Sequence, residues 1–84
     1  MIWLSKAASL EEAFLYFADC QAATLENLAC KKRSPKSELL RQHDICIKML
    51  ETAGRFKLDA KEIQHIHERI ESAMAMRHDV FPDA

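Results

Sequence analysis

Two interruptions divide this chain into three segments, and each segment has the periodicity of an amphipathic α-helix. The first interruption is Ser34-Pro35, and the second runs from Gly54 to Asp59. Proline costs no hydrogen bond at the first position of a helix, glycine favours the residue just past a helix end, and aspartate caps a helix start. The pattern predicts helices over about 9–32, 35–53 and 60–78, with Gly54 in a left-handed conformation.

The expected fold class is all-α. The chain has 84 residues, with one Gly, two Pro and a single Val, and it has no alternating strand pattern. This length fits one domain, 1–84, and the short connections make successive helices antiparallel neighbours. We therefore expect a three-helix up-down-up antiparallel bundle, or a helical hairpin with a third helix laid across it.

The first helix carries more apolar surface than the other two. One stripe was assigned to the core: Leu10, Phe14, Phe17, Gln21, Leu25 and Leu28. A second stripe lies beside it: Leu15, Ala18, Ala22, Leu25 and Ala29. Together they cover about half of the circumference, which is wider than one face of a bundle needs. Either this helix lies centrally between the other two, or part of its surface is left for a partner.

The second and third helices each have one apolar arc, which we expect to be buried. In the second helix the arc contains Leu39, Leu40, His43, Cys46, Ile47, Leu50 and Ala53. In the third it contains Ile63, Ile66, Ile70, Ala73 and Met74, with Phe81 in line beyond. The opposite side of the third helix is polar and should face water: Gln64, His65, Glu68, Arg69, Glu71 and Ser72.

Several apolar residues fall outside the expected core, and a cluster of such residues would mark an interface. Tyr16, Ile45 and Met76 point away from their helix stripes. Trp3 precedes the first helix and is either a lid over the bundle end near Phe56 or an aromatic anchor for a partner. The predicted partner-binding set is Trp3, Leu4, Leu15, Tyr16, Ala18, Ala22, Ile45 and Met76.

A basic patch lies between the first two helices and contains Lys31, Lys32, Arg33 and Lys36. We interpret it as a solvated turn that complements the negative end of the first helix dipole, with phosphate contact as the alternative. The net charge of −1 gives no general attraction to nucleic acid or to anionic lipid. A helix-turn-helix use of the third helix is also disfavoured, because Glu62, Glu68 and Glu71 would repel phosphates.

The sequence offers no catalytic or metal-binding constellation. Glu62 and His65 have the spacing of a di-iron bundle motif, but that site needs a second copy. The three cysteines form no CxxC pair, and reduced thiols in a cytoplasmic protein are the simple interpretation. We expect no enzyme activity, cofactor, metal, membrane span or small-molecule substrate.

The functional hypothesis is a non-enzymatic protein–protein interaction module, such as an adaptor, a regulator or a chaperone-like protein. It would bind another protein, or itself as a homodimer, through the broad apolar face of the first helix. The alternative is a helix-turn-helix-like nucleic-acid regulator that uses the basic turn or the third helix. In size and helix content the chain is similar to small bacterial accessory proteins, such as secretion chaperones and phage- or plasmid-borne regulators.

Overall fold

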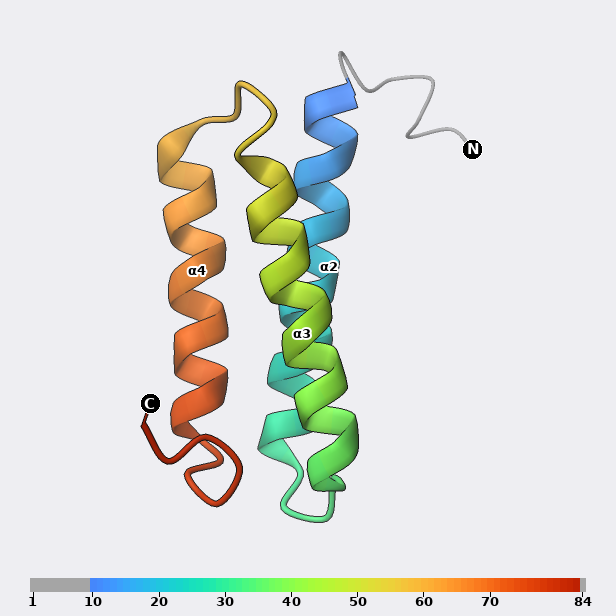
Figure 1. Cartoon of the computed structure of the whole chain (residues 1–84), viewed down its shortest axis with the longest axis vertical. Helices are drawn as coiled ribbons and strands as arrows, with labels where there is room; N and C mark the ends of the chain where they lie inside the picture. The colour runs from blue at the N-terminus through green and yellow to red at the C-terminus, as the bar shows by residue number, and fades with distance from the viewer. Residues whose placement is uncertain (1–9, 84) are drawn as a thin grey trace.

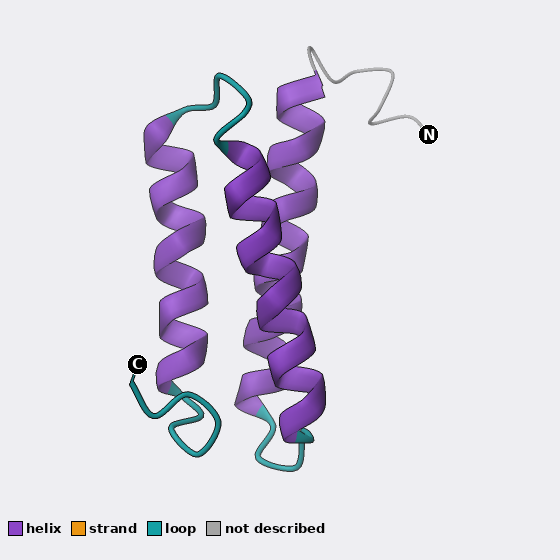
Figure 2. Cartoon of the chain, viewed as in Figure 1, coloured by secondary structure: helices purple, strands orange, loops and turns teal. Residues whose placement is uncertain are grey.

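The computed structural model describes residues 10–83, which form three α-helices: α2 (Leu10–Cys30), α3 (Lys36–Ala53) and α4 (Ala60–Ala75). Successive helices are antiparallel, so that α2 runs down, α3 runs up and α4 runs down in Figure 1, and short loops join them. Figure 2 shows that no strand occurs in this part of the chain. The predicted all-α three-helix bundle is therefore confirmed.

The central element of the bundle is α2. It packs along both α3 and α4, whereas α3 and α4 contact each other much less. The buried core includes Ala18, Ala22, Leu25, Ala29, Leu39, Cys46, Ile66, Ile70, Ala73 and Phe81. Small side chains on α2 let two helices approach it closely, so its wide apolar face serves both neighbours.

This packing corrects the assignment of the two stripes of the first helix. Ala18 and Ala22 are only 4% and 0% exposed, so their place in the predicted partner-binding set is wrong. Leu10 and Phe17, which were expected in the core, are 70% and 56% exposed. The buried face is centred on the alanine stripe because two helices share it.

On α3, one expected core residue is replaced by a polar one. Leu40 is 50% exposed, whereas Gln42 is buried and lies on the same side as Leu39 and Cys46. The Gln42 side-chain amide donates hydrogen bonds to the backbone oxygen of Gln21 at 3.0 Å and to its side-chain oxygen at 2.8 Å. These bonds satisfy a polar group that would otherwise be costly to bury, and they fix α3 against α2.

Arg69 is a second residue whose surroundings differ from the expectation. It was assigned to the water-facing side of the third helix, but its guanidinium is half-buried against α2. Its Nε donates to Glu26 at 2.8 Å, and its Nη1 donates to Asp19. Hydrogen bonds to both carboxylates raise the pKa of Arg69, with the bond to Glu26 as the largest cause. This cluster ties α4 to α2.

The helix ends follow the prediction with small differences. Asp59 caps α4 as expected, because its carboxylate accepts a hydrogen bond from the Lys61 amide at 2.9 Å. Pro35, rather than Ser34, occupies the cap position of α3. Gly54 has φ −62° and ψ −14°, so the expected left-handed conformation is wrong and any residue could adopt this backbone.

The third helix ends at Ala75, earlier than the expected end near residue 78, because Arg77 turns into the protein. Its Nη1 donates to the backbone oxygens of Ser34 at 3.1 Å and Lys31 at 3.3 Å. Its Nε and Nη2 each donate to the Asp79 carboxylate at 2.9 Å. Arg77 therefore fastens the carboxyl-terminal tail to the α2–α3 turn.

The adjacent residues Leu39 and Leu40 test the corrected core. Leu39 is 0% exposed, so Leu39→Ala should lower the free energy of unfolding by about 2–5 kcal/mol through lost burial and a cavity. Leu40→Ala should cost less than about 1 kcal/mol because its side chain is already half in water. Urea denaturation of the two variants measures both values, and equal losses would contradict this core.

The contact between Arg77 and Asp79 should weaken at low pH, when the Asp79 carboxylate becomes protonated. Hydrogen bonds from Arg77 are the largest cause that lowers the Asp79 pKa from 3.8 to about 2. Because folding lowers this pKa, the ionised carboxylate stabilises the fold at pH values above 3.8. That stabilisation is lost as the pH falls from 3.8 through about 2. NMR titration of the Asp79 carboxyl should give a midpoint near the lower value, and Arg77→Gln should move it toward 3.8.

Candidate functional site

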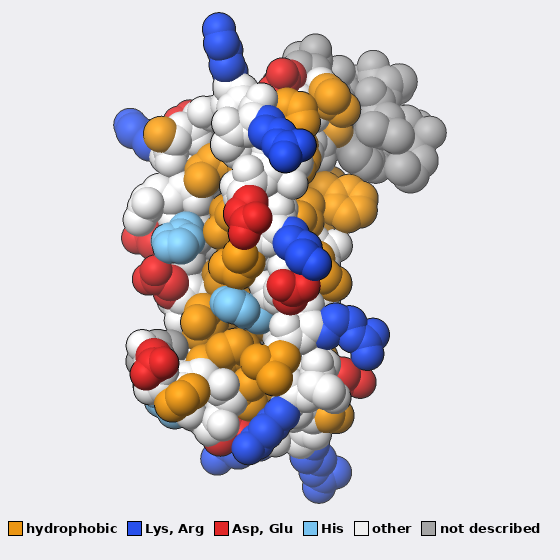
Figure 3. Space-filling view, in the orientation of Figure 1, with side chains coloured by type: hydrophobic (Ala, Val, Ile, Leu, Met, Phe, Trp, Pro, Cys, Tyr) orange, Lys and Arg blue, Asp and Glu red, His pale blue; other side chains and the backbone are white. Residues whose placement is uncertain are grey.

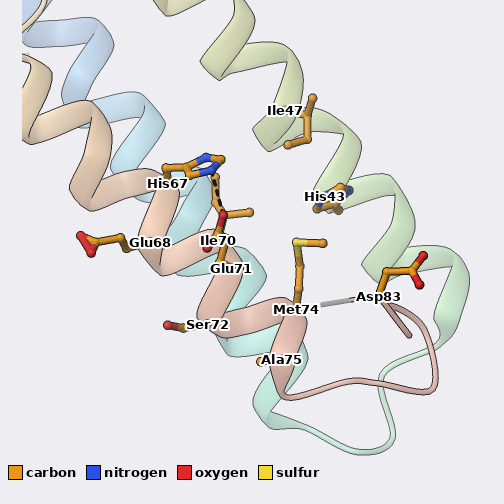
Figure 4. A pocket seen from close by; sticks show the side chains of 10 residues that line it. All are labelled: His43, Ile47, His67, Glu68, Ile70, Glu71, Ser72, Met74, Ala75 and Asp83. Carbon is orange, nitrogen blue, oxygen red and sulfur yellow. Dashed lines mark ion pairs between the residues drawn. The ribbon is translucent and has the colours of Figure 1, made fainter.

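A groove opens between α3 and α4. It has a volume of about 740 Å³, and none of its lining residues comes from α2. It exists because α3 and α4 both pack against α2 and leave the seam between them open. Figure 4 shows its lining: His43, Ile47, His67, Glu68, Ile70, Glu71, Ser72, Met74, Ala75 and Asp83.

The inner surface of this groove is aliphatic. Ile47 lies on α3, Ile70 and Met74 lie on α4, and Met74 points from α4 into the space below His43 (Figure 4). The seam continues toward the α3–α4 loop as a smaller hollow, lined by Leu50, Ala53, Gly54, Phe56, Leu58, Ala60, Ile63 and Gln64. In Figure 3 a band of hydrophobic side chains runs down the face between the two helices.

The charges that line the groove are all acidic. Glu68 and Glu71 lie on α4, Asp83 lies in the tail, and no Lys or Arg is among the lining residues. The Nε2 of His67 lies 2.9 Å from a Glu71 carboxylate oxygen, an (i, i+4) pair drawn as a dashed line in Figure 4. The site is therefore an apolar channel with an acidic edge.

His43 lies at the tail end of the groove, where its ring contacts the buried ring of Phe81, with 5.0 Å between the ring centroids. Burial lowers the pKa of His43 below its ordinary 6.5, and the nearby carboxylate of Asp44 opposes this effect. The imidazole is therefore mainly neutral at pH 7. The prediction of a buried histidine holds in part, because the residue is half-buried.

The structure does not bring the predicted partner-binding residues into one patch. Tyr16 and Ile45 are exposed on different helices, and Leu15 is half-buried beside Tyr16 in a shallow hollow between α2 and α4. Met76 is exposed, but its sulfur lies 3.7 Å from that of Cys30, at the other end of α2. The predictions for Trp3 and Leu4 lie outside the described residues.

The basic patch is where the sequence placed it. Lys31, Lys32, Arg33 and Lys36 are all exposed in the α2–α3 turn and at the start of α3. Arg77 reaches the same end of the bundle, as expected from the topology, but it is buried and its charge is paired with Asp79. Arg77 therefore adds no exposed positive charge to this turn.

Sequence reasoning assigned Ile47 and Met74 to the core and so missed the groove, whereas Ile70 is buried as expected and also lines the groove. The available signal was the width of the apolar arcs on the second and third helices. Each arc is wide enough to face both α2 and the seam, but periodicity alone does not show that the seam stays open.

Two further findings concern residues 10–83 alone. Within this range, no group of three or more His, Cys, Asp or Glu side chains could hold a metal ion. The three helices described there are also too short or too polar to cross a lipid bilayer.

The titration of His43 tests the groove geometry. Because the folded state disfavours the protonated ring, stability from this residue is complete above pH 6.5 and is lost as the pH falls from 6.5 through the lower pKa of the folded state. We expect an NMR midpoint for the His43 ring below 6.5, and we expect His43→Gln to weaken the loss of stability on acidification. His65→Gln, on the exposed side of α4, is the control. A midpoint above 6.5 would contradict the described burial.

Comparison with protein-family models gives no match, and comparisons with curated proteins and with solved structures give no significant similarity.

Proposed function

We propose that this chain is a non-enzymatic protein-interaction module whose α3–α4 groove receives an amphipathic helix of another protein. The observation that carries the proposal is the open seam between α3 and α4, with aliphatic side chains inside it and carboxylates along its edge. A helix laid in this seam would complete a four-helix bundle and bury the exposed apolar band.

The length of the seam supports a helical occupant. From Ile63 to Ala75, α4 advances about 18 Å at 1.5 Å per residue, which matches about three turns of a docked helix. Apolar anchors spaced three and four residues apart would meet Ile47 and Met74, which are both half-buried in the seam.

The charges support a particular chemistry for the flanks of that helix. Glu68, Glu71 and Asp83 line the groove and no Lys or Arg is among the lining residues, so lysine or arginine beside the apolar anchors would complement them. A helix with acidic flanks would meet like charges along the same edge.

The class of function is the one predicted from the sequence, but the proposed binding surface is the α3–α4 groove instead of the apolar face of the first helix. The alanine stripe of the first helix is covered by α3 and α4, so it is not the surface proposed for another protein. The nucleic-acid alternative gains no support, because Glu62, Glu68 and Glu71 lie on the exposed side of α4.

The test uses two matched 14-residue peptides that share a leucine face and differ only in flanking Lys or Glu. We expect the Lys peptide to shift NMR resonances of groove residues and the Glu peptide to bind at least about tenfold more weakly, a difference of about 1.4 kcal/mol. In the variant Glu68→Lys, Glu71→Lys the preference should weaken or reverse. Both residues are exposed, so the fold should tolerate the change.

The control for charge reversal is Glu38→Lys, Glu51→Lys on α3, two exposed residues that do not line the groove. This variant should keep the preference for the Lys peptide. Equal binding of the two peptides, or resonance shifts confined to residues outside the seam, would refute the proposal.

A further inference from the structure

Two sulfur atoms from distant parts of the chain meet at one end of the bundle. The Sγ of Cys30 lies 3.7 Å from the Sδ of Met76, although the two residues are 46 positions apart in the sequence. Cys30 is the last residue of α2, and Met76 follows the last residue of α4. Both residues are exposed. A thiol and a thioether therefore lie side by side where a dissolved ion can reach both.

The chemistry of this pair favours a soft metal ion. Thiolate and thioether sulfur select Cu(I) and similar polarizable ions, whereas Mg²⁺ and Ca²⁺ prefer oxygen ligands. Zn²⁺ also binds thiolates, but it takes about four ligands from Cys, His, Asp and Glu. Within residues 10–83, no group of even three such side chains could hold a metal ion. A soft monovalent cation, which binds with only two or three ligands, fits the pair better.

The charges around the pair favour a cation of low charge. Both α2 and α4 have their carboxyl ends at this end of the bundle (Figure 1), and neither has a basic residue in its last turn. The partial negative charge of the two helix ends attracts a cation. Lys31, Lys32 and Arg33 follow α2 directly and are exposed, so a divalent cation would be repelled more strongly than a monovalent one. A single thiolate fully neutralises the charge of a monovalent ion.

We infer that Cys30 and Met76 together bind a soft monovalent cation, Cu(I) or its analogue Ag(I). When the metal–sulfur bond forms, the Cys30 thiol releases its proton to water, so one cation replaces one proton and no electron is transferred. The Met76 thioether adds a second bond through a sulfur lone pair. This inference is independent of the proposed function, because neither residue lines the α3–α4 groove.

The distance between the sulfurs also indicates how the ion would be held. Metal–sulfur bonds are about 2.3 Å long, so two of them to atoms 3.7 Å apart enclose an angle of roughly 105–110° at the metal. An ion in this position has an open side, which water or an external thiol would occupy. Structural metal sites are closed by protein ligands, so we expect this site to exchange its ion rather than to hold it permanently.

The experiment must separate this site from the affinity of any exposed thiol for soft metals. Cys20→Ser leaves Cys30 as the exposed thiol, because Cys46 is buried. In this variant, labelled at the methionine methyl groups, silver nitrate in chloride-free buffer should shift the NMR signal of Met76 until one Ag(I) is bound per chain. The methyl signals of Met49 and Met74, which are half-buried, should stay in place.

The matched control is Cys30→Ser, which keeps the exposed Cys20. Ag(I) should react with the Cys20 thiol in this variant and leave the Met76 methyl signal unchanged. If the Met76 signal also stays unchanged in Cys20→Ser after Cys30 has bound Ag(I), the methionine is not a ligand and the inference is overturned.

Affinity provides a second measurement. In the Cys20→Ser background, Met76→Leu removes the thioether with little change of volume at a position that is 50% exposed, and circular dichroism checks that the helices remain. Competition with a chromogenic Cu(I) chelator, with ascorbate keeping the copper reduced, should show at least tenfold weaker binding without the thioether. Equal affinities of the two chains would overturn the inference. Met76→Leu should still bind the Lys-flanked peptide in the groove, so the two proposals can fail separately.

Discussion

The packing of this protein depends on α2, which contacts both of the other helices. The alanines of α2, together with Leu25, form a low surface against which α3 and α4 both pack. Because α3 and α4 both pack on α2, they contact each other much less than they contact α2. This arrangement leaves two surfaces uncovered by the described part of the chain. One is the seam between α3 and α4, and the other is the outward side of α2.

Polar bonds fix the arrangement that the apolar packing permits. Gln42 binds the backbone of α2 from one side, and Arg69 binds two carboxylates of α2 from the other. Apolar burial has no preferred direction, so these directional bonds set how α3 and α4 are rotated and shifted along α2. Each neighbour of the central helix thus has its own polar anchor, and the width of the groove depends on both.

The fold class and the helix limits were accessible from the sequence because the signals are local. The Asp59 carboxylate caps a helix by accepting a hydrogen bond from the amide two residues later, and Pro35 ends a run whatever surrounds it. The groove was not accessible, because Ile47 and Met74 have the same periodicity whether a seam is closed or open. Gln42 was missed for a related reason. Its spacing matches Leu39 and Cys46, but a polar residue is not expected in the core until its hydrogen-bond partner on α2 is known.

The assignment of the two stripes on the first helix failed for a physical reason as well. Large side chains such as Phe17 are strongly hydrophobic, whereas alanine is only weakly so. Hydrophobicity alone therefore predicts that the stripe with Phe17, rather than the alanine stripe, is the buried side of the first helix. Two neighbouring helices reverse that preference, because close approach requires small side chains on the shared face. Leu10 and Phe17, which the sequence placed in the core, are therefore exposed, whereas Leu25 of the same stripe is buried as expected.

The fastening of the tail by Arg77 gives the groove two unequal ends. The guanidinium holds Asp79 near the α2–α3 turn, and at that end Asp83 lines the groove while the buried ring of Phe81 contacts His43. The hollow at the opposite end, toward the α3–α4 loop, has no charged residue among its described lining residues. A helix in the seam would thus have a defined polarity, with its amino terminus and its partial positive charge near Asp83.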